Sequence, residues 1–345
     1  MKNKLLIFIV FVSLGTGFFL GGYFFKGLQT TNLATLKSPL TKPLPTPLAK
    51  YTIENLSQAE IGPGKLTLEK IIKEEEKFCS WLFFFEFSPD LSGKNFKRVS
   101  GLINLPQQAG TYPVILMLRG YVDQKIYQTG MGTSRAGEYF SQNGFITIAP
   151  DFLGYGESDK EAENIFEARF QSYVTVLSLL KQLKSSKGIQ IKNDKWHGEN
   201  IMLWGHSNGG QIALTILEIT QEALPTTLWA PVSKPFPYSI LYYTDESEDR
   251  GKLIRKELAK FEEVYDVDNY SLTNYFDKIN KETLLQIHQG TADDAVPVTW
   301  TNALVKTLKG LDLNLNFFLY PGADHNLKPA WDLVVKRDLD FFKKN

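Results

Sequence analysis

The sequence contains very little cysteine and histidine. Cys79 is the only cysteine in 345 residues, so no disulfide can form within the chain. The histidines are His197, His206, His288 and His325. They form no Cys/His cluster with zinc spacing, and the chain has no Walker-type nucleotide loop. The sequence therefore predicts neither a metal nor a cofactor, and it offers few candidates for a catalytic base.

The chain also lacks an excess of either charge. Lys plus Arg and Asp plus Glu each number 38, so no whole-chain field favours nucleic acid as a partner. Hydrophobic residues make up 43% and charged residues 22%, as in globular proteins. The length suits one large domain with appendages, or two small domains.

A long apolar run occupies the N-terminus, from Leu5 to Phe25, between Lys4 and Lys26. A helix of this length reaches roughly 30 Å, enough to span the hydrocarbon core of a bilayer. A signal peptide usually has a shorter apolar region and an A-x-A-like cleavage site, which we do not find here. Residues 1–27 are therefore predicted to be a transmembrane anchor with the catalytic domain extracytoplasmic. Secretion after signal cleavage remains the alternative.

Residues 28–50 are predicted to be a linker. Thr, Ser and Pro dominate this segment, and its four prolines favour an extended spacer. The globular domain is accordingly expected to span residues 51–345.

In that domain, short apolar runs alternate with helical apolar patterns. The expected strands are 81–87, 98–105, 114–118, 145–149, 201–204, 227–229, 284–288 and 314–320, and residues 68–77 form either a charged helix or an edge strand. The expected helices are 134–142, 165–183, one starting at 207, 300–308 and 330–342. The alternation predicts an α/β fold, a mostly parallel sheet covered by helices on both faces, with the first two strands as an antiparallel hairpin. Residues 233–282 interrupt it and are predicted to be a helical lid, or else decoration at the far edge.

A Gly-x-Ser-x-Gly motif, Gly205 to Gly209, joins a predicted strand to a predicted helix. A serine on such a sharp turn stands clear of the backbone, and the glycines allow strand and helix to pass closely. Ser207 is therefore the candidate nucleophile. The alternative is a serine that only caps a helix.

A catalytic serine needs a base and an acid on neighbouring loops. Only His325, in the loop after the last strand, is expected at the carboxyl end of the sheet with Ser207. The loop after the preceding strand supplies two acids, Asp293 and Asp294, and both remain open from the residues alone.

An oxyanion hole needs two N–H donors. The first candidate is Asn208, directly after the serine. The second is Tyr121, which follows Gly120 just after the strand 114–118.

The motifs Gly205–Gly210, Gly290–Asp294 and Asp324-His325, with the loop 151–159, resemble the α/β-hydrolase fold. The resemblance covers roughly residues 80–345 and is closest to prolyl-oligopeptidase-like serine peptidases and their esterase relatives. It implies Asp293 as the acid. Two features depart from the family: Arg119 stands where a histidine commonly precedes the oxyanion glycine, and there is no room for an N-terminal β-propeller.

The sequence thus predicts a membrane-anchored serine hydrolase acting on small esters or short peptides through an acyl-enzyme. A carboxylesterase without peptidase activity is the alternative within the same chemistry. A binding protein that uses the fold without catalysis is the alternative outside it.

Overall fold

The structure is a computed structural model that describes residues 45–185, 189–191, 194–244 and 249–345. The predicted anchor, residues 1–27, and residues 28–44 of the predicted linker lie outside the described residues. Within those ranges no helix is long and apolar enough to cross a membrane. The compact unit described below is Thr46–Asn345.

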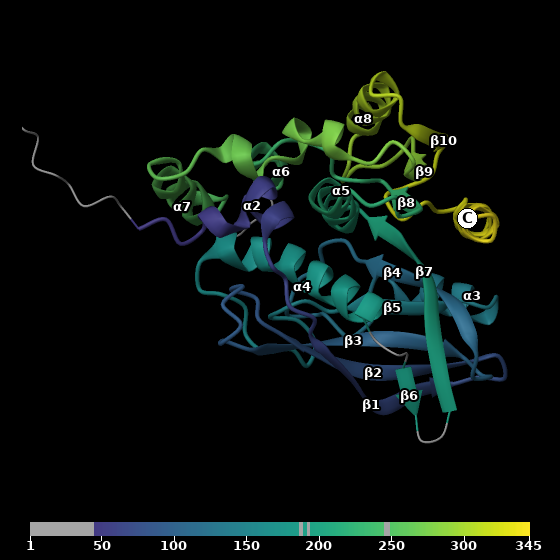
Figure 1. Cartoon of the computed structure of the whole chain (residues 1–345). Helices are drawn as coiled ribbons and strands as arrows, with labels where there is room; N and C mark the ends of the chain where they lie inside the picture. The colour runs from purple at the N-terminus through teal and green to yellow at the C-terminus, as the bar shows by residue number, and fades with distance from the viewer. Residues whose placement is uncertain (1–44, 186–188, 192–193, 245–248) are drawn as a thin grey trace, which may run out of the picture. The chain divides into compact units, whose positions relative to one another are not determined.

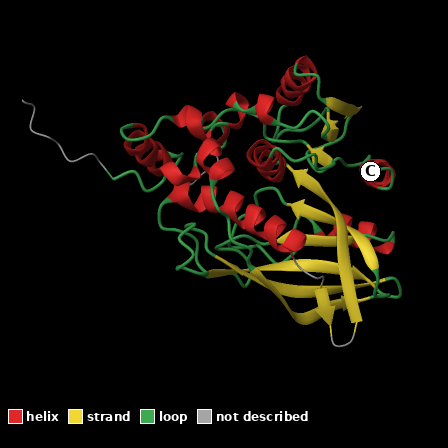
Figure 2. Ribbon diagram, in the orientation of Figure 1, coloured by secondary structure: helices red, strands yellow, loops and turns green. Residues whose placement is uncertain are grey.

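A central sheet organises this unit (Figures 1 and 2). Its strands are β1 (Lys65–Glu74), β2 (Phe78–Phe87), β3 (Lys97–Pro106), β4 (Thr111–Leu118), β5 (Ile146–Pro150), β7 (Asp194–His206), β8 (Thr226–Trp229), β9 (Leu284–Gly290) and β10 (Asn314–Tyr320). They lie in the order β1-β2-β3-β5-β4-β7-β8-β9-β10, and the short β6 (Ile189–Ile191) pairs with β7.

The sheet is parallel from β5 to β10 and antiparallel from β1 to β5. The predicted hairpin of the first two strands, β2 and β3, is confirmed, as is the alternation of strands and helices. Residues 68–77, predicted to be either a charged helix or an edge strand, lie mostly in the edge strand β1. Its side chains are mostly exposed, as suits an edge strand.

Helices cover both faces of the sheet. On one face lie α4 (Ile165–Ser185), α5 (Asn208–Thr220) and α8 (Val298–Gly310), and on the other lie α3 (Ser134–Gln142) and α9 (Trp331–Phe342) (Figure 1). Strand β4 shows why both faces of the sheet are covered, because its apolar side chains point alternately to one face and to the other. Val114 and Leu116 join the core under α4 and α5, while Ile115 and Met117 join the core under α3 and α9.

The described residues of the predicted lid, 233–282, include α6 (Tyr238–Leu241), α7 (Lys252–Glu262) and the 3-10 turns Val267–Tyr270, Leu272–Asn274 and Phe276–Lys278. Aromatic side chains attach it to α4. Phe236 and Phe261 are buried, with ring centroids 5.6 and 5.1 Å from the ring of Phe166. The insertion therefore packs into the core along much of its length, and its role as a lid stays a prediction.

The compact unit begins earlier than the predicted boundary at residue 51. Leu48, assigned to the linker, is buried. Its N–H donates to the Tyr265 hydroxyl at 3.0 Å, and its carbonyl accepts from the Tyr270 hydroxyl at 3.1 Å. A single apolar residue among prolines shows no periodicity, so the sequence pattern does not predict its burial. The burial of Leu48 depends on Tyr265 and Tyr270, which contact it. A short helix, α2 (Ile53–Gln58), follows.

Helix α5 carries a buried acid, Glu218. The side chain is 1% exposed, and neither carboxylate oxygen has a hydrogen-bond partner among the described residues. Burial, and secondarily the charge of Asp277, raises the pKa of Glu218 well above its usual range. Folding therefore favours the protonated form of Glu218, at a cost that grows with pH.

We expect Glu218→Met to raise the free energy of unfolding by roughly 1–3 kcal/mol, because it removes an unpaired buried polar group. The gain should be larger at pH 8 than at pH 5. The unfolded chain releases the Glu218 proton above a pKa of about 4.3, and the folded chain holds it, so wild-type stability falls as pH rises. Urea unfolding at both pH values measures this, with Glu262→Met on exposed α7 as the control. An equal gain at both pH values would contradict the assignment.

Candidate active site

Ser207 occupies the turn between β7, which ends at His206, and α5, which begins at Asn208. Its backbone has φ 55° and ψ −117°, a conformation that non-glycine residues rarely adopt. Two bonds to the segment at the end of β8 hold it: the Ser207 N–H donates to Trp229 O at 2.8 Å, and the Ser207 carbonyl accepts from the Val232 N–H at 3.1 Å. The turn is therefore a fixed feature of the sheet.

Close approach explains the glycine at position 209. A Cβ on Gly209 would overlap the backbone carbonyl of Leu118, the last residue of β4. The first turn of α5 thus passes directly against the end of β4. The N–H of Asn208 lies in that first turn, where helical N–H groups have no partner within the helix.

Asp293 and His325 meet on neighbouring loops after β9 and β10. His325 Nδ1 lies 2.9 Å from Asp293 Oδ2 and 3.0 Å from Oδ1. The Asp293 side chain is fully buried, and that of His325 is 18% exposed. Burial alone would raise the pKa of Asp293, but hydrogen bonds from His325 and from the Val296 N–H outweigh it and lower that pKa.

Asp294 contrasts with its neighbour. It is exposed and makes no hydrogen bond among the described residues. Of the two acids that the sequence left open, the structure brings only Asp293 to His325.

His206 supports His325 from behind. Its ring lies 4.7 Å from the ring of His325, and its Nε2 is 3.0 Å from the His325 carbonyl oxygen. Burial, and then the nearby His325, lowers the pKa of His206 to about 4. A neutral His206 can donate its Nε2 proton to that carbonyl. The residue before the serine thereby fixes the backbone of the histidine loop.

The structure does not join all three candidates by hydrogen bonds. Within the described part of the chain, the Ser207 hydroxyl makes no hydrogen bond to His325. Ser207 is half-buried and lies one residue from His206, which contacts His325. The structure therefore gives the Asp293–His325 pair directly, and the assignment of Ser207 to the same triad stays a prediction.

The loop after β4 runs along the other side of Ser207. A Cβ on Gly120 would stand 3.1 Å from Ser207 Cβ. The Gly120 carbonyl accepts from Arg119 Nη1 at 2.9 Å. In a planar trans peptide the next N–H points opposite to the carbonyl, so Arg119 fixes the direction of the Tyr121 N–H. The Tyr121 side chain is exposed.

Arg119 is itself buried and tightly held. Its guanidinium carbon lies 3.9 Å from the ring centroid of Tyr155 and 4.5 Å from that of Tyr127. Its Nη2 donates to Asp151 O at 2.8 Å. The buried Asp151 carboxylate accepts from the Tyr127 hydroxyl at 2.6 Å and from Thr129 Oγ1 at 2.7 Å. Arg119 thus ties the loop after β4 to its neighbours.

Sequence reasoning missed the contributions of His206, Arg119 and Gln289. Gln289 donates to Asp293 Oδ2 at 2.9 Å and accepts from Thr301 Oγ1 at 2.6 Å. Their positions in the sequence partly indicated a role in the site, since His206 adjoins the serine and Gln289 precedes the Gly290 motif. Their partners follow only from the tertiary structure. Among the described residues, no group of three or more His, Cys, Asp or Glu side chains could hold a metal ion.

A family model described as Chlorophyllase matches residues 93–227. No curated protein matches the chain. Acetyl xylan esterase 1 from Thermoanaerobacterium sp. JW/SL YS485 is 14% identical with a TM-score of 0.59, covering 88% of this chain and 96% of its own.

Two other solved structures are also similar. The α/β hydrolase GrgF from Penicillium sp. sh18 is 17% identical with a TM-score of 0.50, and 76% of this chain and 97% of that chain are covered. A putative dipeptidyl aminopeptidase IV from Bacteroides ovatus ATCC 8483 is 16% identical with a TM-score of 0.54, covering 82% of this chain but only 36% of its own. At these identities the likeness establishes the fold. The chain has the α/β-hydrolase fold, and the closer resemblance to prolyl-oligopeptidase-like peptidases stays a prediction.

We expect His206→Gln to change how stability depends on pH. In the wild type the unfolded state binds a proton on residue 206 below a pKa of about 6.5, and the folded state does not until about 4. The wild type should therefore lose on the order of 3 kcal/mol through this group as pH falls across that window. Glutamine keeps an N–H donor for the His325 carbonyl but does not titrate. Urea unfolding at pH 7, 5.5 and 4.5 measures the difference, and parallel pH curves would contradict this account.

Proposed function

We propose that this chain is a serine hydrolase that cleaves ester bonds of small substrates, and peptide bonds of short ones, through an acyl-enzyme. Ser207 is the nucleophile, His325 the base and Asp293 the acid that orients His325. The observation that carries the proposal is the contact of His325 Nδ1 with both oxygens of the buried Asp293 carboxylate. This pair stands beside a serine held at positive φ on a strand-to-helix turn.

The chemistry follows from these positions. With its Nδ1 proton held by Asp293, His325 keeps Nε2 free to accept the Ser207 proton. The serine oxygen attacks the substrate carbonyl, and the N–H groups of Asn208 and Tyr121 bind the oxyanion that forms. His325 then protonates the leaving group, and water releases the acyl group by the same steps. Hydrogen bonds of this kind are often long without substrate and tighten once it is bound, which accounts for the open Ser207–His325 contact.

The size of one cavity supports a short acyl group. A cavity of about 190 Å³ is lined by residues that include Tyr121, Asn208 and Ile212. Because the two proposed oxyanion donors belong to residues in its wall, the acyl side of a bound ester would extend into it. Sites for drug-sized ligands usually measure about 300–1,000 Å³. Acetyl and similar short acyl groups fit this cavity better than long chains.

The lengths of the similar proteins, compared with the length of this chain, favour esters as the first substrates to test. The chain covers nearly all of the acetyl xylan esterase from Thermoanaerobacterium, but only about a third of the dipeptidyl aminopeptidase. The likeness supports the choice through the fold alone. A panel of p-nitrophenyl acetate, butyrate and decanoate beside dipeptidyl p-nitroanilides would separate an esterase from a peptidase.

We expect Ser207→Ala to abolish hydrolysis of p-nitrophenyl acetate, with a loss on the order of 10³-fold or more in kcat. Rapid labelling by a fluorophosphonate probe should disappear with it, since only an activated serine reacts quickly. Circular dichroism and urea unfolding of the variant control for folding. A wild type that neither labels nor turns over any member of the panel would favour the non-catalytic binding protein.

We expect Asp293→Asn to lower kcat far more than Asp294→Asn. The amide at 293 would leave His325 in the wrong tautomer, a change that costs near 10⁴-fold in comparable triads. Asp294 is exposed, so its variant is a matched control that carries the same charge change one residue away. Steady-state kinetics on p-nitrophenyl acetate measures both. Equal losses would rule out the separate roles assigned here.

We also propose that Leu5–Phe25 anchors the protein in a membrane with the hydrolase domain extracytoplasmic. The support is the length and apolarity of this run, with lysines directly before it. The full-length protein should resist carbonate extraction, while a truncated protein beginning at Thr46 should be soluble and active. A protein beginning at Tyr51 should be less stable than that one, because it loses the buried Leu48. Full-length protein shortened by about 25 residues and found in the medium would indicate a cleaved signal instead.

A further inference from the structure

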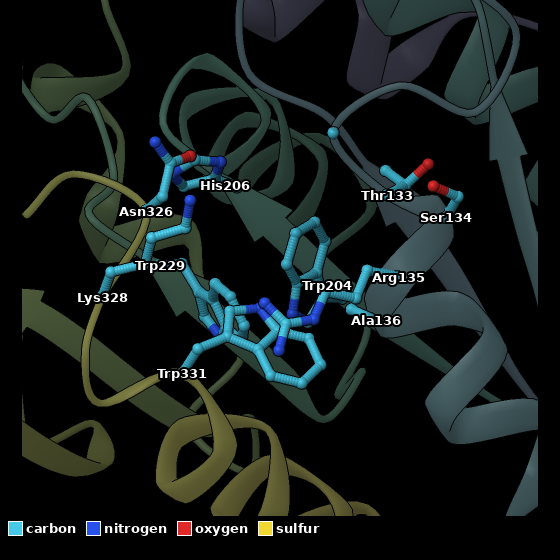
Figure 3. A pocket seen from close by; sticks show the side chains of 11 residues that line it. Thr133, Ser134, Arg135, Ala136, Trp204, His206, Trp229, Asn326, Lys328 and Trp331 are labelled. Atoms are coloured by element: carbon cyan, nitrogen blue, oxygen red, sulfur yellow. The ribbon is translucent and has the colours of Figure 1, made fainter.

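A second cavity lies behind the candidate site, between the start of α3 and the loop that precedes α9 (Figure 3). Its volume is about 360 Å³, within the range usual for small-molecule sites. His206 lines this cavity, whereas Asn208 and Tyr121 line the smaller one, and the two share no lining residue. It is therefore separate from the proposed acyl cavity.

Three indole rings form its wall. The ring centroids of Trp204 and Trp229 lie 5.1 Å apart, and those of Trp229 and Trp331 lie 6.3 Å apart, both pairs edge to face. Figure 3 shows the three rings grouped at one end of the cavity. The indole N–H of Trp229 donates to Asp338, but that of Trp204 is buried with no hydrogen-bond partner among the described residues. Trp204 and Trp229 are only 1% and 3% exposed, so the half-buried Trp331 supplies most of the indole surface that faces the cavity.

Two cations flank these rings from opposite sides (Figure 3). The Arg135 guanidinium carbon lies 3.4 Å from the ring centroid of Trp331. Lys328 comes from the loop after His325, and its side chain makes no ion pair among the described residues. The described lining residues include no Asp or Glu.

The nearby acids are already engaged or exposed. Asp332 contacts Arg135 at 3.4 Å, but its side chain is 90% exposed, and surface pairs of this kind contribute little. Asp324 accepts from the backbone N–H groups of Asn326 and Lys328, both at 2.9 Å. A ligand carboxylate could therefore replace Asp332 on Arg135, where a planar guanidinium binds both oxygens.

We propose that this cavity binds a planar aromatic carboxylate. The ring would lie against Trp331, with the buried Trp229 and Trp204 packed beside that ring, and the carboxylate would face Arg135 and Lys328. The ligand needs both the aromatic ring and the carboxylate. Indole rings favour a flat unsaturated partner through ring contacts, and two cations without a lining acid favour an anion over a neutral sugar or alcohol.

The test uses 2-naphthoate, with 2-naphthalenemethanol as the neutral analogue and cyclohexanecarboxylate as the non-aromatic anion. Isothermal titration calorimetry on the Ser207→Ala full chain measures binding without turnover, so failure of the proposed hydrolase function would not affect the result. We expect 2-naphthoate to bind at one site and the other two compounds to bind at least tenfold more weakly. No binding of 2-naphthoate up to millimolar concentration, or equal binding of the alcohol, would overturn the proposal.

Variants locate the site. Arg135→Gln combined with Lys328→Gln should weaken 2-naphthoate at least tenfold, and so should Trp331→Leu. Arg98→Gln is the matched control, because Arg98 also stacks on an aromatic ring, with its guanidinium carbon 4.0 Å from the ring centroid of Phe84, but lies outside the cavity. Unchanged affinity in the double variant would overturn the proposal. So would loss of binding when Ser207 of the wild-type chain is blocked by a fluorophosphonate, since the ligand would then occupy the catalytic cavity.

Discussion

The close passage of α5 across the end of β4 constrains the whole site. Gly209 leaves no space for a side chain against the Leu118 carbonyl, so the chain must turn sharply between β7 and the helix. That turn puts Ser207 at φ 55°, a conformation that costs on the order of 1–3 kcal/mol and persists only where neighbours determine it. Here the neighbours are Trp229 and Val232, whose backbone groups bond both the N–H and the carbonyl of the serine.

The buried carboxyl groups of this fold are of two kinds. Asp293, Asp151 and Asp338 are each surrounded by donors, and each joins separate parts of the chain. Asp338 of α9 accepts from Trp229 Nε1 at 2.6 Å and Gln286 Nε2 at 3.0 Å, and lies 2.8 Å from His288 Nε2, so the last helix is tied to β8 and β9. Glu218 has no such donors among the described residues, and its pKa is raised instead. A buried carboxyl group is stable either as a carboxylate that accepts hydrogen bonds or in its neutral, protonated form.

His206 lies between the candidate catalytic histidine and the aromatic cavity. One side of its ring faces His325, and the residue also lines the cavity with the three indoles. Because its pKa is lowered to about 4, it stays neutral near pH 7 and places no charge between the candidate catalytic histidine and the aromatic wall. The histidine loop is thus supported by an uncharged hydrogen bond, while the cations Arg135 and Lys328 flank the cavity.

The amino-acid sequence was sufficient to predict the fold class and to name candidate site residues. Periodicity distinguishes buried strands from helices, and a glycine-flanked serine between the two is typical of a nucleophile on a strand-to-helix turn. The loops after the last two strands follow from the same alternation, which is why Asp293 and His325 could be named. Asp293 could be separated from Asp294 only by resemblance, because adjacent residues of one type carry no pattern.

Contacts between side chains far apart in sequence required the tertiary structure. The burial of Leu48 depends on Tyr265 and Tyr270, more than 200 residues away. The role of Arg119 depends on Tyr155 and on the carbonyl of Asp151, and the aromatic cavity depends on three tryptophans from three elements. Local sequence pattern records which face of an element is apolar. It does not record which partner that face meets, since packing depends on the whole arrangement of strands and helices.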